Sequence, residues 1–255
     1  MCIQQPDIAL MIDLKIYLIT GIGGARHGFV AGWLGTLPNF IDNQWYIDIE
    51  TGHTNGYMSI LKDLDQGMLF TDFLKNKDFC LSPTAQKYFA GQCHGHFLKK
   101  SVSQLDTKCV TVIKIDTSNV DPNHIAWEFL VKTYLRKNRA KNNYEDDTYW
   151  NIDKKINKPY NLITDQDRIK QFTVLATTFK LPTAEQFEVP GIDILLLDYT
   201  KLFCIDGSQY LCDQLDFTVI NYLYHQYWNY MLKLAKSPDS INVWGVDWNK
   251  SDFFN

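Results

Sequence analysis

The hydrophobic pattern of this chain alternates between two periods. Short runs rich in β-branched and aromatic residues are typical of strands, and longer stretches with apolar residues three or four positions apart are typical of helices. The pattern predicts strands at Leu14–Thr20, Gln44–Glu50, Tyr88–Cys93, Lys108–Ile115 and Ile192–Tyr199. It predicts helices at Phe29–Leu37, Tyr57–Leu64, Asn123–Lys137, Gln166–Phe179, Ser208–Leu215 and Thr218–Ala235.

Strands that alternate with helices indicate an α/β fold with three layers, in which helices flank a mainly parallel central sheet. The run Ile192–Tyr199 is almost continuously apolar, which predicts a strand buried on both faces. Residues Arg139–Asn161 are dense in Asn, Asp, Lys and Tyr, so we expect a lid or surface insertion there. The chain has no internal repeat and no low-complexity tract, and we expect residues 1–255 to form a single domain.

Composition limits the class of protein. The chain is 45% hydrophobic, 14% aromatic and 21% charged, values that exclude a largely disordered chain and a coiled coil. No apolar run reaches the roughly 18 residues that a spanning helix needs, and Asp7, Asp13 and Lys15 interrupt the N-terminal segment, so neither a membrane span nor a secretory signal is expected. None of the six cysteines forms a C-x-x-C pair, which predicts reduced thiols in a cytoplasmic protein.

The net charge limits the partners. It is −4, from 25 basic and 29 acidic residues, so the overall basic footprint of a nucleic-acid-binding protein is missing and no nucleic-acid partner is expected. An anionic ligand would have to bind through a local cluster of donors rather than through overall attraction.

The clearest local motif is the glycine-rich turn I-T-G-I-G-G-A-R-H-G-F-V, which joins the first predicted strand to the first predicted helix. Glycines let the backbone turn sharply and bring several N–H groups toward one ligand, and the helix N-terminus adds the positive end of its dipole. Arg26 supplies a fixed charge and a fork of donors. The motif predicts a phosphate or sulfate site, and the alternative is a tight turn that binds nothing.

Two common nucleotide motifs do not fit this turn. Gly23 and Gly28 have the spacing of G-x-x-x-x-G-K-[ST], but Phe29 and Val30 stand where that motif has its phosphate-binding Lys and its Mg²⁺-binding hydroxyl. The dinucleotide pattern G-x-G-x-x-G, counted from Gly21, has Arg26 in place of its third glycine. We therefore expect neither an ATP- or GTP-hydrolysing site nor a bound metal here.

The turn G-G-A-R-H-G resembles the 5′-phosphosulfate loop of sulfotransferases, which have a P-loop-type fold and a P-[KR]-S-G-[ST] turn after the first strand. In this alignment Arg26 takes the basic position, while Ala25 replaces Pro and Phe29 replaces the hydroxyl residue. Sulfuryl transfer needs backbone donors and a cation near the bridging oxygen, and no metal clamp. The resemblance implies that 3′-phosphoadenosine 5′-phosphosulfate is bound by Gly23, Gly24, Ala25, Arg26, His27, Gly28 and Phe29.

Two histidines follow the strand predicted at Tyr88–Cys93. Gln92-Cys93-His94 resembles the strand-ending Lys-Thr-His of sulfotransferases, which implies that His94 is the general base at the acceptor hydroxyl. Histidine suits that task because its pKa lies near neutrality. His96 is the alternative base, and a pair of loop histidines with no task is the other interpretation. His-x-His can also bind zinc, but no further ligand has convincing spacing.

The 3′-phosphate contact is expected after the strand at Lys108–Ile115. In sulfotransferases this strand ends in Arg, and a Ser follows; here Asp116 stands in the Arg position, and Lys114, Ser118 and His124 are the substitutes. We assign Ser118 to the 3′-phosphate. The alternative is a plain turn before a helix that begins near Pro122.

The resemblance also extends to residues 192–215, with Thr200 in place of the family's Glu. It implies an enzyme that moves a sulfuryl group to the hydroxyl of a small-molecule or glycan acceptor, with Arg26 and His94 as catalytic residues. The alternatives are a P-loop-type kinase of nucleotides or phosphometabolites, which would need Mg²⁺ and ATP, and a non-catalytic α/β binding protein. The enzymatic interpretation requires that the guanidinium of Arg26 is not held in a salt bridge elsewhere. The sequence does not predict the acceptor or the oligomeric state.

Overall fold

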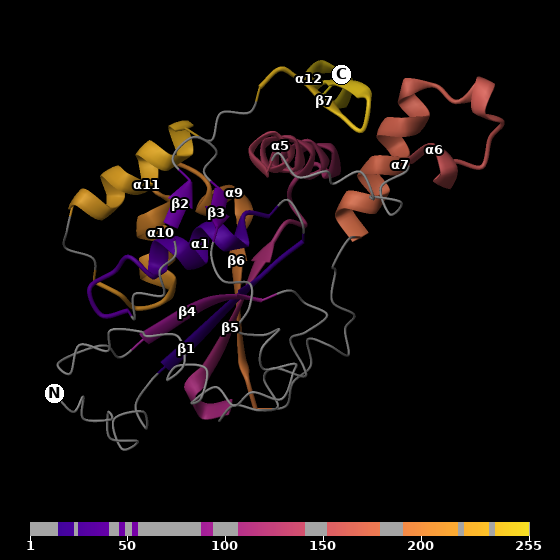
Figure 1. Cartoon of the computed structure of the whole chain (residues 1–255). Coiled ribbons are helices and arrows are strands. Elements are labelled where there is room, and N and C mark those ends of the chain that lie inside the picture. Colours follow the sequence, from indigo (N-terminus) through magenta and orange to yellow (C-terminus); the bar gives the residue numbers. More distant parts are fainter. Residues whose placement is uncertain are drawn as a thin grey trace, which may run out of the picture.

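Four of the five predicted strands form one parallel sheet (Figure 1). They are β1 (Lys15–Thr20), β4 (Tyr88–Cys93), β5 (Val110–Asp116) and β6 (Asp193–Asp198), in the order β4-β1-β5-β6. All three pairings are parallel. The α/β class with a parallel sheet is thus confirmed. The computed structural model describes residues 15–22, 25–40, 46–48, 53–55, 88–93, 107–140, 152–178, 191–218, 222–234 and 238–254.

One face of the sheet is covered by helices (Figure 1). Alternate apolar residues of the strands, such as Tyr17 and Ile19 of β1 and Ile113 and Ile115 of β5, join a single buried apolar cluster with these helices. This follows from the period of two in a strand, which sends alternate side chains to the same face. The helices are α1 (His27–Leu34), α9 (Tyr199–Leu202), α10 (Gly207–Gln214) and α11 (Tyr222–Leu234).

Helix α1 is buried along its whole length. It packs on β1 and β4, and the antiparallel hairpin of β2 (Tyr46–Asp48) and β3 (His53–Asn55) lies beside it (Figure 1). Trp33 and Phe29 of α1 both make edge-on contacts with Trp228 of α11, with ring centroids 5.1 and 4.7 Å apart. The central strand and the helix after it are therefore held by the best-packed part of the core.

A second apolar cluster forms around α5 (Pro122–Ala140), which lies beyond one end of the sheet (Figure 1). Trp127 of α5 and Phe172 of α7 are both fully buried in it. The aromatic C-terminal segment contributes Trp248 and Phe253 to this cluster. The remaining elements are α7 (Asp165–Thr178), β7 (Ser240–Val243), β8 (Val246–Asn249), α12 (Lys250–Phe253) and the short helical turn Thr107–Cys109 before β5.

Strand β6 is not buried on both faces, so that prediction is wrong. Among the strands that the structure describes, it lies at the end of the sheet order and pairs with β5 alone. Leu197 is buried in the sheet core, but Ile194 is 41% exposed and Leu196 is 56% exposed on the opposite face. A run of apolar residues shows only that a segment is hydrophobic. It does not distinguish a central strand from an edge strand with one open face.

The predicted insertion at Arg139–Asn161 is partly regular structure. Helix α5 extends to Ala140, α6 spans Ile152–Lys155 and a 3₁₀ turn spans Tyr160–Leu162, whereas residues 141–151 lie outside the described part. The helix predicted at Tyr57–Leu64 also lies outside it. Within the residues described here, no helix is both long enough and apolar enough to cross a membrane.

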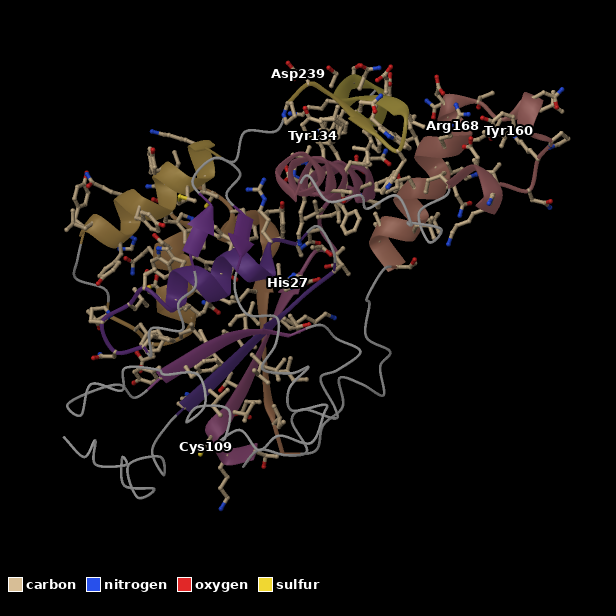
Figure 2. The ribbon with its side chains drawn as sticks, in the orientation of Figure 1. His27, Cys109, Tyr134, Tyr160, Arg168 and Asp239 are labelled. Atoms are coloured by element: carbon tan, nitrogen blue, oxygen red, sulfur yellow. The ribbon has the colours of Figure 1, made fainter. Side chains whose placement is uncertain are left out.

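Polar contacts hold α6 and α7 together. Arg168 donates to both carboxylate oxygens of Asp153, at 2.9 and 3.2 Å, and to Asp165 at 2.8 Å (Figure 2 labels Arg168). Thr164 and Asp167 form a reciprocal capping box, in which each backbone N–H donates to the other side chain, at 3.0 and 3.2 Å. The hydrogen bond from Lys158, helped by those from Thr164, lowers the pKa of Asp167 to about 2.

Candidate functional site

The glycine-rich turn lies at the carboxyl end of β1. Because β1 lies inside the sheet with β4 on one side and β5 on the other, the strand order changes direction there, and parallel α/β sheets bind ligands at such points. Figure 2 shows His27, just after the turn, at the end of the sheet nearer α5, and Cys109 at the opposite end. The Ala25 N–H donates to the Ile22 carbonyl at 3.0 Å, which closes the turn. Gly23 and Gly24 lie outside the described residues.

Arg26 is the N-cap residue of α1 and has a left-handed backbone, with φ 50° and ψ 25°. Its carbonyl accepts the N–H of Phe29 at 2.9 Å, so the helix begins directly after it. The side chain of Arg26 makes no capping hydrogen bond to this N-terminus, and the first turn of α1 contains no acidic residue. Nothing within the helix therefore compensates the positive end of its dipole.

The guanidinium of Arg26 forms an ion pair with Glu128 of α5. The enzymatic interpretation required a guanidinium without such a salt bridge, so on this point the structure contradicts that expectation. Nε donates to Glu128 Oε2 at 3.1 Å, and Nη2 donates to the same oxygen. Burial opposes the positive charge, but the Glu128 carboxylate and its hydrogen bond outweigh this effect and raise the pKa of Arg26. The Arg26 side chain remains 22% exposed, and the Nε–Nη2 edge of its guanidinium is the edge that Glu128 occupies.

Aromatic side chains from α9 and the residue after it line the other side of Arg26. The Arg26 guanidinium carbon lies 5.8 Å from the ring centre of Phe203, and Phe203 packs on Tyr199 at 4.8 Å. Burial, with a contribution from Glu128, raises the pKa of Tyr199 to about 12 although Arg26 opposes the shift, so its hydroxyl stays neutral at physiological pH. The ring of His124 meets the Tyr199 ring edge-on at 6.1 Å.

Three of the turn residues that were predicted to bind the donor are buried: Ala25, His27 and Phe29. Ala25 is fully buried, and Phe29 is 4% exposed and packs against Trp228 and Phe203. His27 is 2% exposed, and a Cβ added to Gly21 would lie 3.7 Å from its Nδ1. The backbone of Gly28, also buried, belongs to the first turn of α1. Thus Phe29 contributes packing, and the polar groups of the described turn include its backbone N–H groups, the buried His27 imidazole and Arg26.

Ser118 is held by its own turn. Its backbone N–H and its hydroxyl both donate to the carboxylate of Asp116, each at 3.0 Å, and α5 begins at Pro122 as the turn interpretation predicts. A carboxylate bound to this hydroxyl makes the position unfavourable for a phosphate, because like charges repel. The assignment of Ser118 to the 3′-phosphate stays a prediction. His94 and His96 lie outside the described residues.

The structure adds Glu128 and Tyr199 to the site, and it brings His124 close to them. The sequence contains one signal for Glu128, a single carboxylate inside the apolar segment I-A-W-E-F-L of α5. A charged residue among buried neighbours is rarely without a partner. The partner could not be identified, because Arg26 and Glu128 are 102 positions apart in the sequence.

The arrangement suits a small anion. It combines an uncapped helix N-terminus, a cation and an aromatic wall at the carboxyl edge of a parallel sheet. In the part of the chain that the structure describes, no three His, Cys, Asp or Glu side chains group as metal ligands would. Comparison with known protein families, with curated proteins and with solved structures finds no match to this chain.

Proposed function

We propose that the chain binds the 5′ end of an anionic nucleotide at the β1–α1 turn and is a sulfotransferase-like enzyme. Its donor would be 3′-phosphoadenosine 5′-phosphosulfate, and its acceptor would be the hydroxyl of a small molecule or glycan. The observation that carries this proposal is the start of α1 at Arg26, after the glycine turn at the carboxyl edge of the parallel sheet. Because Arg26 is paired with Glu128, this observation supports the binding part of the proposal, and the ion pair counts against the catalytic part.

The sheet supports the same proposal at the level of the fold. A parallel sheet in which the first strand lies inside and leads through a glycine turn into a buried helix fits a P-loop-type fold. Phe29 and Val30 stand where kinase-type loops have their phosphate-binding Lys and Mg²⁺-binding hydroxyl, which disfavours phosphoryl transfer. Phe29 also replaces the hydroxyl residue of the sulfotransferase loop, so this position departs from both motifs.

The proposed reaction assigns simple tasks to the residues. Backbone N–H groups of the turn would hold the donor's oxygens, and Arg26 would stabilise the charge that grows on the bridging oxygen as the sulfuryl group leaves. His94 is the proposed base for the acceptor's proton, with His96 as the alternative. The aromatic pair Tyr199 and Phe203 would exclude water from the side of Arg26 that Glu128 leaves open.

Calorimetry with adenosine 3′,5′-bisphosphate, the product that the donor leaves behind, tests this proposal. In a buffer without Mg²⁺ we expect saturable binding with a dissociation constant of about 1 mM or lower. No heat of binding at millimolar ligand would contradict the proposal. Stabilisation by ATP that requires Mg²⁺, seen as a rise in melting temperature, would instead indicate the kinase alternative.

A second candidate function is a non-catalytic binding protein of the same fold. Two observations favour it: the ion pair with Glu128 occupies part of the guanidinium of Arg26, and Asp116 occupies the hydroxyl of Ser118. This candidate predicts that the bisphosphate still binds the turn, but that no sulfuryl group is transferred and that His94→Ala leaves binding unchanged.

A further inference from the structure

The ion pair makes the charge of the site unusual. One carboxylate oxygen of Glu128 accepts from both Nε and Nη2 of Arg26, so the positive charge at the turn is matched by a negative charge in direct contact. A ligand at this turn therefore meets both charges.

The geometry leaves one edge of the guanidinium for a ligand. Glu128 takes the Nε–Nη2 edge, Phe203 lies 5.8 Å from the guanidinium carbon, and the Arg26 side chain is 22% exposed. A ligand oxygen that accepts from Nη1 would lie roughly 6 Å from the Glu128 carboxylate, by ordinary hydrogen-bond lengths. Glu128 is only 13% exposed, so water screens this short distance weakly.

We propose that Glu128 determines the ligand class of this site: it favours a terminal group with one negative charge over a terminal group with two. A terminal sulfate ester carries a single charge, whereas a terminal phosphate carries about −1.5 to −2 near neutral pH. Arg26 attracts both groups, and Glu128 repels the second charge of the phosphate. This inference rests on the proposed function and names the feature by which the site would distinguish phosphosulfate from diphosphate.

Repulsion by Glu128 would also differ between the donor before sulfuryl transfer and the product after it. When the acceptor oxygen bonds to sulfur, the bond from sulfur to the bridging oxygen breaks. That oxygen stays on the 5′-phosphate with the electron pair, and the acceptor's proton passes to the base. The 5′-phosphate thereby gains a negative charge close to Glu128, which would favour release of the bisphosphate product.

Two ligands that differ only in their terminal group test the inference. They are 3′-phosphoadenosine 5′-phosphosulfate and adenosine 3′-phosphate 5′-diphosphate, titrated separately at pH 8 without Mg²⁺ or acceptor. We expect the wild-type chain to bind the phosphosulfate about tenfold more tightly, and Glu128→Gln to bind both about equally. Glutamine keeps a carbonyl oxygen that accepts from Arg26 and removes only the charge.

Asp213→Asn is the matched control. It changes the net charge by the same amount at an exposed carboxylate on α10, which is held by Gln209 at 2.6 Å. This variant should keep the wild-type preference. If the Glu128→Gln variant does not fold, Glu128→Ala removes the same negative charge and takes its place in the titrations.

The outcomes separate this inference from the proposed function. If neither ligand binds the wild-type chain, the proposed function is wrong and the inference falls with it. If both ligands bind but the wild-type chain shows no preference, or if the preference survives in a folded Glu128 variant, then Glu128 does not select the ligand and only the inference is overturned.

Discussion

Arg26→Ala is expected to lower the affinity for adenosine 3′,5′-bisphosphate by about 100-fold or more, which calorimetry would record as lost binding. The substitution removes the only side-chain cation found at the described part of the turn, together with the N–H groups that Glu128 leaves open. Charge-assisted hydrogen bonds are about twice as strong as neutral ones, and a site with low exposure screens them little. Arg26→Lys keeps the positive charge but loses the planar fork of donors. The affinity of this variant for the bisphosphate should therefore lie between that of the wild-type chain and that of Arg26→Ala.

A control must separate lost binding from lost stability. Arg26→Ala also leaves Glu128, 13% exposed, without its partner, and an unpaired carboxylate in such a place lowers the free energy of unfolding. The double variant Arg26→Ala/Glu128→Gln removes that unpaired charge, so we expect it to recover stability without recovering binding. Wild-type affinity in the single variant would exclude Arg26 from the site.

Gly207→Ala should be the most destabilising single-methyl change in the described part of the chain. A Cβ at this position would lie 1.6 Å from the Leu202 carbonyl oxygen and 3.2 Å from Trp228 Nε1. The carbonyl belongs to the backbone of α9 and Trp228 is fully buried, so neither neighbour can move away cheaply. We expect the free energy of unfolding to fall by about 3 kcal/mol or more, as in severely overpacked cores.

Urea denaturation measures this effect, with Gly245→Ala as the comparison. Gly245, in the turn between β7 and β8, has nothing within 4 Å of an added Cβ, and its φ of +76° is its only obstacle. That change should cost about 1 kcal/mol, the strain of a left-handed alanine. Equal denaturation midpoints for the two variants would show that α9 and α10 do not pack as closely as described.

Hydrophobic patterns in the sequence predicted the strands and helices that position the candidate site. The strand at Tyr88–Cys93 was predicted with its observed bounds, and β1 and α5 were predicted to within a few residues at each end. These elements have a strong hydrophobic periodicity or a clear boundary signal. Examples are the glycine turn after Thr20, which ends β1, and Pro122, which begins α5. Their alternation along the chain also predicted a parallel sheet, since parallel strands need crossover connections.

The rest depends on contacts between distant segments. The strand order decides that β6 lies at an edge, and its own apolar residues contain no trace of that order. Arg26 and Glu128 meet only because α5 passes over the end of the sheet where the turn lies. The sequence marks Arg26 as a cation of the glycine turn and Glu128 as a carboxylate in an apolar segment, but only the structure shows that the two are paired with each other.

An amide chemical-shift titration of the ¹⁵N-labelled chain with adenosine 3′,5′-bisphosphate tests the central claim most directly. If the β1–α1 turn binds an oxyanion through its main-chain N–H groups, the amides of Arg26, His27 and Gly28 should shift saturably and together. The amides of Gly207 and Ser208, at the N-terminus of α10, should not follow them. Unchanged positions for the three turn amides at saturating ligand, or shifts confined to other helix N-termini, would contradict the claim.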